Sequence, residues 1–307
     1  MRRIKIKAPA TVANLSCGYD ILGLCLDKPF DEIEISKISE KNIILESIKT
    51  DFSNIPINPK QNTGGLPAIL IQEDLNLNHG FKISIKKGVP LFGGMGSSAA
   101  TAVGVVYGIN KLLGNPLDNN DIIKYALEGE KISSDTPHAD NIGPCLLGGL
   151  VLIKGTNPLD LIQLPIGPLY VSIIHPDIQI STKIARELLP KSITMKKAIK
   201  QWSNIAALTY GFTVNDHNII KRSMHDNIIE PVRSKLIPGF NKIQYAANKE
   251  GALGCSISGS GPSIFALSQN KNEAEKVLLA MKKEASKFSY LFHSYLTPIN
   301  HSGVTTI

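Results

Sequence analysis

The stretch Pro90-Leu-Phe-Gly-Gly-Met-Gly-Ser-Ser-Ala-Ala100 joins a glycine-rich turn to the beginning of a predicted helix. Apolar residues recur at helical spacing from Ala99 to Ile109, and Gly114 supplies a stop. The first N–H groups of a helix have no partner within the helix, and with the helix dipole they favour an anion. Glycines let the backbone approach that anion closely. The stretch therefore predicts a phosphate-binding loop.

Other nucleotide-binding motifs fit this loop less well. No Gly-Lys-Ser/Thr follows, so the loop is not a Walker A motif. Gly94-x-Gly96-x-x-Ala99 is a degenerate dinucleotide-binding fingerprint, but the acidic residue expected after the next strand is missing. A nicotinamide-dependent oxidoreductase is thus a weaker alternative. The hydroxyls of Ser97 and Ser98 suit a phosphate or a magnesium ion.

Hydrophobic periodicity predicts an α+β protein of two domains, residues 1–157 and 158–307. Strands are expected around Ile4 and Ile6, around Ile33 and Ile35, and at 81–86, 148–153, 170–174, 253–258 and 263–267; helices are expected at 120–132, 240–249 and 272–287. Glu130 falls on the apolar stripe of the helix at 120–132, where a hydrophobic residue is expected.

Two further segments carry polar groups in unusual settings. Pro9-Ala-Thr-Val-Ala-Asn-Leu-Ser-Cys-Gly-Tyr-Asp-Ile-Leu-Gly23 is too apolar for an ordinary surface loop. Within it, Asn14 offers a donor and an acceptor, and Asp20 offers a carboxylate that could hold an ammonium group. Ser258-Gly-Ser-Gly-Pro-Ser-Ile-Phe-Ala-Leu267 predicts a tight turn between two strands, able to close on a ligand.

Composition narrows the class of protein. The 307 residues carry a net charge of +7, yet only 6% are aromatic and no basic cluster is interleaved with aromatics, so we expect no nucleic-acid partner. The four cysteines form no CxxC pair, and no apolar stretch reaches the roughly 20 residues of a membrane span. The beginning of the chain lacks the apolar core of a signal peptide. We therefore expect a cytoplasmic protein without a membrane partner.

In this order and at these separations, the three segments resemble the signature motifs of the GHMP kinases (galacto-, homoserine, mevalonate and phosphomevalonate kinases). Met95 stands where leucine is usual in the phosphate loop. His138-Ala-Asp-Asn-Ile-Gly-Pro144 and the segment 226–239 are similar to the homoserine kinase branch. The chain departs from that branch at Ser16-Cys-Gly-Tyr19, where the family typically has Gly-Pro-Gly-Phe.

The resemblance implies a fold and an activity. The fold would be that of a GHMP kinase, with a ribosomal S5 domain 2-like N-terminal domain for ATP, a ferredoxin-like C-terminal domain, and the active site at their interface. The activity would be ATP- and Mg²⁺-dependent phosphorylation of the side-chain hydroxyl of L-homoserine for threonine biosynthesis, in a homodimer. The alternatives are a GHMP kinase acting on mevalonate or a sugar, and a non-catalytic metabolite sensor on the same fold.

The resemblance also assigns site residues. Substrate would be bound by Asn14, Asp20, His138, Asn141, Arg186 and Arg233; the metal by Ser98 and Glu130; and ATP by Pro90, Gly93, Gly94, Met95, Gly96, Ser97, Ser98, Ala99, Ala100, Asn62, Gly259, Ser260 and Gly261. Two arginines suit a carboxylate, and Asp20 suits an ammonium group. Asp140, Asn141 and Glu130 are the catalytic candidates. Whether Asp140 acts as a general base or Asn141 only orients the hydroxyl stays open at this point.

Overall fold

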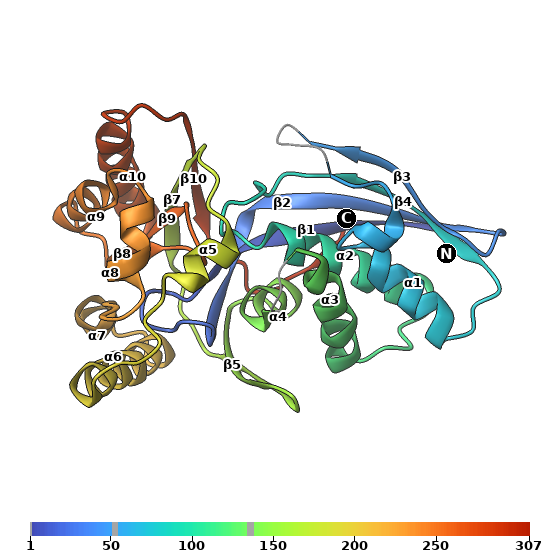
Figure 1. The fold of residues 1–307 in the computed structure, drawn as a ribbon, viewed down its shortest axis with the longest axis horizontal. Helices are drawn as coiled ribbons and strands as arrows, with labels where there is room; N and C mark the ends of the chain where they lie inside the picture. Colours follow the sequence, from blue (N-terminus) through green and yellow to red (C-terminus); the bar gives the residue numbers. More distant parts are fainter. Residues whose placement is uncertain (1, 51–54, 134–137) are drawn as a thin grey trace.

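The computed structural model describes residues 2–50, 55–133 and 138–307. A larger sheet and a smaller sheet lie side by side, each with its own helices (Figure 1). The strands are β1 Arg3–Ala13, β2 Leu22–Ile38, β3 Ile43–Lys49, β4 Gly80–Lys86, β5 Leu150–Thr156, β6 Leu159–Leu164, β7 Tyr170–Pro176, β8 Gly254–Ile257, β9 Ile264–Ser268, β10 Phe292–Pro298 and β11 Thr305–Thr306. The helices are α1 Gly65–Asp74, α2 Ser97–Leu112, α3 Asn119–Ser133, α4 Ala139–Leu147, α5 Thr182–Glu187, α6 Met195–Thr213, α7 His217–Ser223, α8 Glu230–Arg233, α9 Phe240–Lys249 and α10 Lys271–Ala285, with short 3-10 turns η1 Pro59–Gln61 and η2 Ser234–Leu236.

The larger sheet has the strand order β11-β1-β2-β4-β3, and β5 extends it by pairing with β2 and β6. Ile4, Ile33 and Ile83 lie on its inner face, because alternate side chains of a strand point to opposite faces. Helices α1 to α4 all lie on that side of the sheet (Figure 1). Charged side chains such as Glu34 and Lys86 lie between the apolar ones and pair with neighbouring strands. The predicted alternation is confirmed.

Helix α2 is more deeply buried than an amphipathic pattern predicts. Of its 16 residues, 13 are buried. It packs against β1 and β2 on one side and against α1, α3 and α4 on others. The phosphate loop therefore leads into a helix that is buried along most of its length.

The smaller sheet has the order β10-β7-β9-β8, and all its pairs are antiparallel. With the helices between β7 and β8 and with α10 between β9 and β10, this is a β-α-β-β-α-β unit of ferredoxin-like type. It has a core of its own around Phe240, Ile257 and Met281. The predicted α+β class and the ferredoxin-like second domain are confirmed.

The two halves share strands across the boundary expected at residue 157. β6 pairs with β5, and β11, close to the C-terminus, pairs with β1, so the larger sheet contains segments that follow the boundary. The boundary itself stays a prediction, and we propose it as the point near which the chain passes to the second sheet.

Candidate active site at the junction of the two sheets

The phosphate loop requires glycine at two positions. Gly94 and Gly96 both have φ of +68°, and Gly96 is the N-cap of α2. A Cβ on Gly94 would lie 2.1 Å from the carbonyl oxygen of Ser258, and one on Gly96 would lie 2.2 Å from Oγ1 of Thr11. Both positions therefore combine a left-handed backbone with close packing, which only glycine tolerates. The N-terminus of α2 is left facing a cavity.

This cavity has a volume of about 480 Å³ and lies between the two sheets. The predicted site residues that line it are Asn14, Asp20, Asn62, Gly93, Gly94, Gly96, Ser97, Ser98, Glu130, His138, Asp140, Asn141, Arg186, Arg233, Gly259 and Ser260. Ile48, Ile85 and Leu91 contribute apolar side chains to the lining. Asp20, Arg186 and Arg233 lie close to one another and form the charged end of the cavity.

Glu130 and Ser98 meet at the phosphate end of the cavity. Burial raises the pKa of Glu130 to about 7, although a hydrogen bond from Ser98 and the charge of Lys87 act against this rise. Among the described residues, Oε1 of Glu130 has no hydrogen-bond partner. A buried, unsatisfied carboxylate oxygen beside a hydroxyl, at the edge of an anion site, fits a hard divalent cation.

Asp140 and Asn141 lie at the beginning of α4. Asp140 is 3% exposed. Burial, followed by the charges of Asp20 and Glu130, raises the pKa of Asp140 to about 7. Asn141 accepts a hydrogen bond from Oγ1 of Thr11 over 2.7 Å and donates from Nδ2 to Oδ1 of Asp140 over 3.3 Å. Its amide is thus oriented, and the neighbouring carboxyl can change protonation state near neutral pH.

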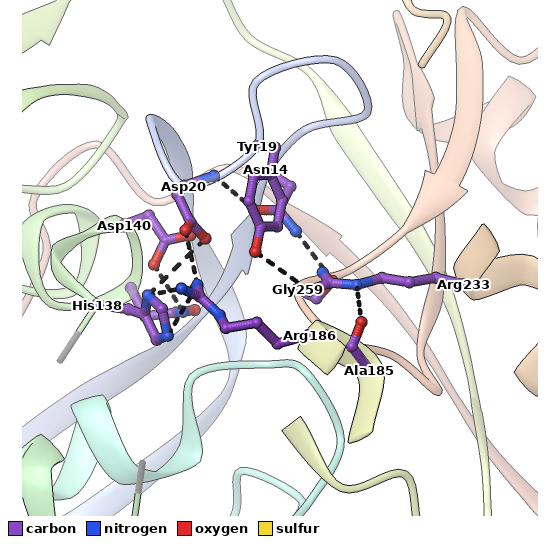
Figure 2. Close-up of polar contacts among 10 residues, drawn as sticks. Asn14, Tyr19, Asp20, His138, Asp140, Ala185, Arg186, Arg233 and Gly259 are labelled. Carbon is purple, nitrogen blue, oxygen red and sulfur yellow. Dashed lines mark hydrogen bonds and ion pairs between the residues drawn. The ribbon is translucent and has the colours of Figure 1, made fainter. Parts of the chain in front are cut away.

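Asp20, His138 and Asp140 gather around the guanidinium of Arg186 (Figure 2). Nη2 of Arg186 donates to Oδ2 of Asp20 over 2.7 Å, and Nδ1 of His138 lies 3.8 Å from Oδ1 of Asp20. Burial lowers the pKa of His138, an effect that Asp20 opposes and the two arginines reinforce. His138 is therefore mainly neutral at pH 7.

Arg233 is a buried cation. Its residue is 4% exposed, and within the described part of the chain no carboxylate forms an ion pair with it. Nε donates to the carbonyl oxygen of Ala185 over 3.4 Å, Nη1 to that of Gly259 over 2.9 Å, and Nη2 to the hydroxyl of Tyr19 over 3.5 Å. A guanidinium has five N–H groups, so one on each terminal nitrogen is left for a ligand. Such a fork matches a carboxylate.

Comparison with known proteins identifies the family. Residues 67–149 match the model of the N-terminal domain of GHMP kinases, and residues 195–287 match that of their C-terminal domain. The homoserine kinase of Chlorobium phaeobacteroides is 38% identical over all of this chain and all of its own length. The chain belongs to the homoserine kinase family of the GHMP kinases.

Solved structures agree with this assignment. The crystal structure of homoserine kinase from Cytophaga hutchinsonii has a TM-score of 0.96 and 44% identity, covering 100% of this chain and 98% of that one. Mevalonate kinase of Methanococcus jannaschii shares the fold, with a TM-score of 0.73 and 17% identity over 96% of this chain and 98% of that one. The predicted family and the predicted GHMP kinase fold are confirmed. A kinase family implies ATP as phosphoryl donor together with a divalent cation.

Five residues of the predicted ATP site do not line the cavity of this GHMP kinase. Pro90, Met95, Ala99, Ala100 and Gly261 are all buried. Met95, Ala99 and Ala100 belong to the main hydrophobic core and anchor the loop from behind. These residues therefore contribute to ligand binding only by shaping the loop.

Asn62 and Asn14 line the cavity but use their amides within the protein. Asn62 donates to the carbonyl oxygen of Pro56 over 2.9 Å, and its Oδ1 accepts from the N–H groups of Gly64 and Gly65. Asn14 donates to the carbonyl oxygen of Gly259 over 2.9 Å and accepts from the N–H of Asp20 over 3.0 Å. Both side chains hold loops in place.

The predicted turn at 258–263 reaches the phosphate loop of the other half. Oγ of Ser258 donates to the carbonyl oxygen of Gly94 over 2.6 Å, and the N–H of Ser263 donates to that of Gly93 over 3.3 Å. The carbonyl of Gly259 also accepts hydrogen bonds from Asn14 and Arg233, as described above. The turn therefore ties the phosphate loop to the charged end of the cavity.

Sequence analysis missed a buried ion pair beneath the phosphate loop. Lys87 pairs with Asp31, and its Nζ also donates to the carbonyl oxygen of Ser97 over 2.8 Å and to Oγ1 of Thr101 over 2.9 Å. Asp31 lies two residues before Ile33, so its side chain points to the same buried face of the sheet. Lys87 follows the buried alternate residues of β4 in the same way. The sequence signal that could have revealed this ion pair is a charged residue at an inward-facing position in β2 and another directly after β4.

One further observation concerns membranes. Over the described ranges of the chain, no helix combines the length and the apolar character that crossing a bilayer requires.

Proposed function

We propose that this protein transfers the γ-phosphoryl group of ATP to the side-chain hydroxyl of L-homoserine, giving O-phospho-L-homoserine for threonine biosynthesis. The observation that carries the proposal is the division of one cavity into two ends. One end is the N-terminus of α2 with Gly94, Gly96 and Ser98, and the other holds Asp20, Arg186 and Arg233. A nucleotide and an amino acid are the two ligands that such ends suit.

The charged end suits a zwitterion. The unpaired fork of Arg233 would take the α-carboxylate, with Arg186 beside it, and Asp20 would take the ammonium group. Arg233 favours an anion strongly, because burial lowers its pKa and leaves its charge poorly solvated. Mevalonate and sugars have no ammonium group and would leave Asp20 without a ligand cation.

Ser98 and Glu130 would hold Mg²⁺ beside the phosphates. The unsatisfied Oε1 of Glu130 fits this role. When bound, the ion would supply positive charge to the phosphoryl oxygens, as in other phosphoryl transfers. The chain's own contribution is positioning, through the loop and the N-terminus of α2.

Asp140 would receive the proton of the attacking hydroxyl, and Asn141 would orient that hydroxyl. The substrate oxygen forms a bond to Pγ, the bond from Pγ to the bridging oxygen breaks, ADP leaves, and the proton passes to the Asp140 carboxylate. A pKa of about 7 lets Asp140 accept a proton and release it again at neutral pH. The alternative is that Asn141 positions the hydroxyl and no general base is used.

A coupled assay of ADP release with Mg-ATP tests the activity, with L-homoserine, mevalonate, galactose and no acceptor compared. Turnover with L-homoserine alone is expected, and turnover only with another acceptor would contradict the proposal. Asp140→Asn should lower kcat by roughly a hundredfold or more if Asp140 is the base. An unchanged kcat in this variant would assign the step to Asn141.

We also propose a homodimer in the cytoplasm. The family resemblance implies the dimer, and α6 presents the exposed apolar side chains of Met195, Ile199, Trp202 and Tyr210, as an association surface would. All four cysteines are free thiols and buried, as in proteins of reducing compartments. Sedimentation velocity tests the dimer, and a monomer at micromolar concentration would contradict it.

A further inference from the structure

Tyr19 lies between the two arginines of the charged end. The centroid of its ring is 5.0 Å from Cζ of Arg233 and 5.8 Å from Cζ of Arg186. Its hydroxyl accepts from Nη2 of Arg233 over 3.5 Å, and Figure 2 draws Tyr19 above these side chains. Both guanidiniums lie within the range in which an aromatic ring attracts a cation.

The ring opposes the mutual repulsion of these cations. The two guanidiniums repel each other, since the charge of Arg186 contributes to the lowered pKa of Arg233. Of the two arginines, Asp20 forms an ion pair with Arg186, whereas Arg233 has no ion-pair partner among the described residues and feels Asp20 only through its charge. The ring of Tyr19 is a further group that favours two guanidiniums in one place, and both arginines share it.

The loop that carries Tyr19 is held in a strained shape. Asn14, Leu15, Ser16 and Asp20 all have φ between +40° and +72°, which non-glycine residues rarely adopt. The shape is held by several hydrogen bonds, among them that from Nε2 of Gln201 to the carbonyl oxygen of Cys17 over 3.1 Å. Strain of this kind persists where the surroundings fix a functional geometry.

We infer that Tyr19 is a positioning residue that fixes both guanidiniums of the substrate-carboxylate clamp through its ring. The inference rests on the proposed function, and it adds a residue to the recognition of the amino acid. Tyr19 does not line the cavity, although Asp20, Arg186 and Arg233 do. It therefore acts through the arginines, and the ring has the larger share because the hydroxyl makes one long hydrogen bond.

The test compares Tyr19→Leu, which removes the ring's charge distribution, with Tyr19→Phe, which keeps it. Tyr19→Leu should raise KM for L-homoserine by roughly tenfold, and Tyr19→Phe by no more than about threefold. KM for ATP should stay within about twofold in both, because the polar partners of the two arginines in the described part of the chain lie outside the phosphate loop. Tyr245→Leu is the matched control, since Tyr245 is 69% exposed on α9.

A second acceptor separates the clamp from general loss of structure. 3-Aminopropan-1-ol is L-homoserine without its carboxylate, so Tyr19→Leu should leave kcat/KM for this alcohol unchanged. An equal loss with both acceptors, or an unchanged KM for L-homoserine, would overturn the inference. If Tyr19→Leu fails to fold by circular dichroism, Tyr19→Met takes its place, with the same expectations.

The inference and the proposed function can fail separately. If the unmodified protein turns over no L-homoserine, the proposed function fails. Calorimetric titration of L-homoserine into the unmodified protein and into Tyr19→Leu then still measures the affinity of the two arginines' site for the amino acid. Binding weakened by roughly tenfold in the variant would support the role of Tyr19, and equal binding, or none to either protein, would overturn it.

Discussion

Arg186 and Asp20 hold each other in the cavity: Nη2 of Arg186 donates to Oδ2 of Asp20 over 2.7 Å. Both side chains are about one-third exposed, so the pair itself stabilises the fold little. A zwitterion can satisfy both groups at once, with its ammonium on Asp20 and its carboxylate on Arg186. A ligand with only one of the two charges satisfies only one of them.

Asp20→Asn should therefore weaken the binding of the amino acid and leave the binding of the nucleotide unchanged. We expect KM for L-homoserine to rise by roughly tenfold or more, because a charged hydrogen bond to the ammonium group is lost. KM for ATP should not change. Steady-state kinetics measures both constants, and Asp27→Asn is the control, since Asp27 pairs with Lys7 at the surface. Equal KM values for L-homoserine in Asp20→Asn and the unmodified protein would contradict this role.

Glu130→Gln should abolish most activity without unfolding the protein. Glutamine keeps the shape but loses the anionic oxygen, so kcat should fall by roughly a hundredfold or more and half-maximal activity should need more Mg²⁺. Titration of Mg²⁺ in the ADP-release assay measures this. Glu128→Gln on the same helix is the control, because Glu128 pairs with Lys131 on the exposed side. Activity near that of the control would exclude Glu130 as a metal ligand.

Lys87→Met should destabilise the fold, in contrast to Lys86→Met. The side chains of Lys87 and Asp31 are 2% and 0% exposed, so the substitution leaves a buried carboxylate without its cation. We expect a loss of about 3–5 kcal/mol in the free energy of unfolding by urea. Lys86 pairs with Glu32 at the surface, where a loss of about 0–1 kcal/mol is expected. The further change Asp31→Asn should restore part of the stability in the Lys87 variant, and no restoration would contradict the pairing.

His175 should make stability fall in acid. It is buried beside Gly93 and Ser263, and burial lowers its pKa to about 4. The unfolded chain binds this proton below about pH 6.5 and the folded protein only below about pH 4, so stability is lost as the pH falls from 6.5 towards 4. Near pH 5 the loss should be about 2 kcal/mol.

Urea unfolding at pH 7 and pH 5 measures this effect. In His175→Phe the difference between the two pH values should shrink by about that amount, because the variant has no proton to bind. His301→Phe, at an exposed position, should behave like the unmodified protein. If His175→Phe loses as much stability between pH 7 and pH 5 as the unmodified protein, the loss comes from other groups.

Much of the local structure could be predicted from the sequence. The helix 240–249 has the observed bounds of α9, and the strands around the turn at 258–263 form the pair β8 and β9. Serine is a favoured residue at the N-cap of a helix, and Ser181 is the N-cap of α5. β3, α1, α4, α6, α7 and β10 were not predicted, because their patterns are short or mixed and tertiary packing decides them.

The sequence by itself determined the periodicity of the main strands and helices, the phosphate loop and the family, because each depends on residues close together in the chain or on their order. Only the tertiary structure decided which polar groups satisfy one another. Asp20 and Arg186 are 166 positions apart, and Asn14 and Gly259 are 245 apart. Hydrogen bonds and charges act over a few ångströms in space, so Asn14 became a brace, Lys87 a buried partner of Asp31, and Tyr19 the support of two arginines once the chain had folded.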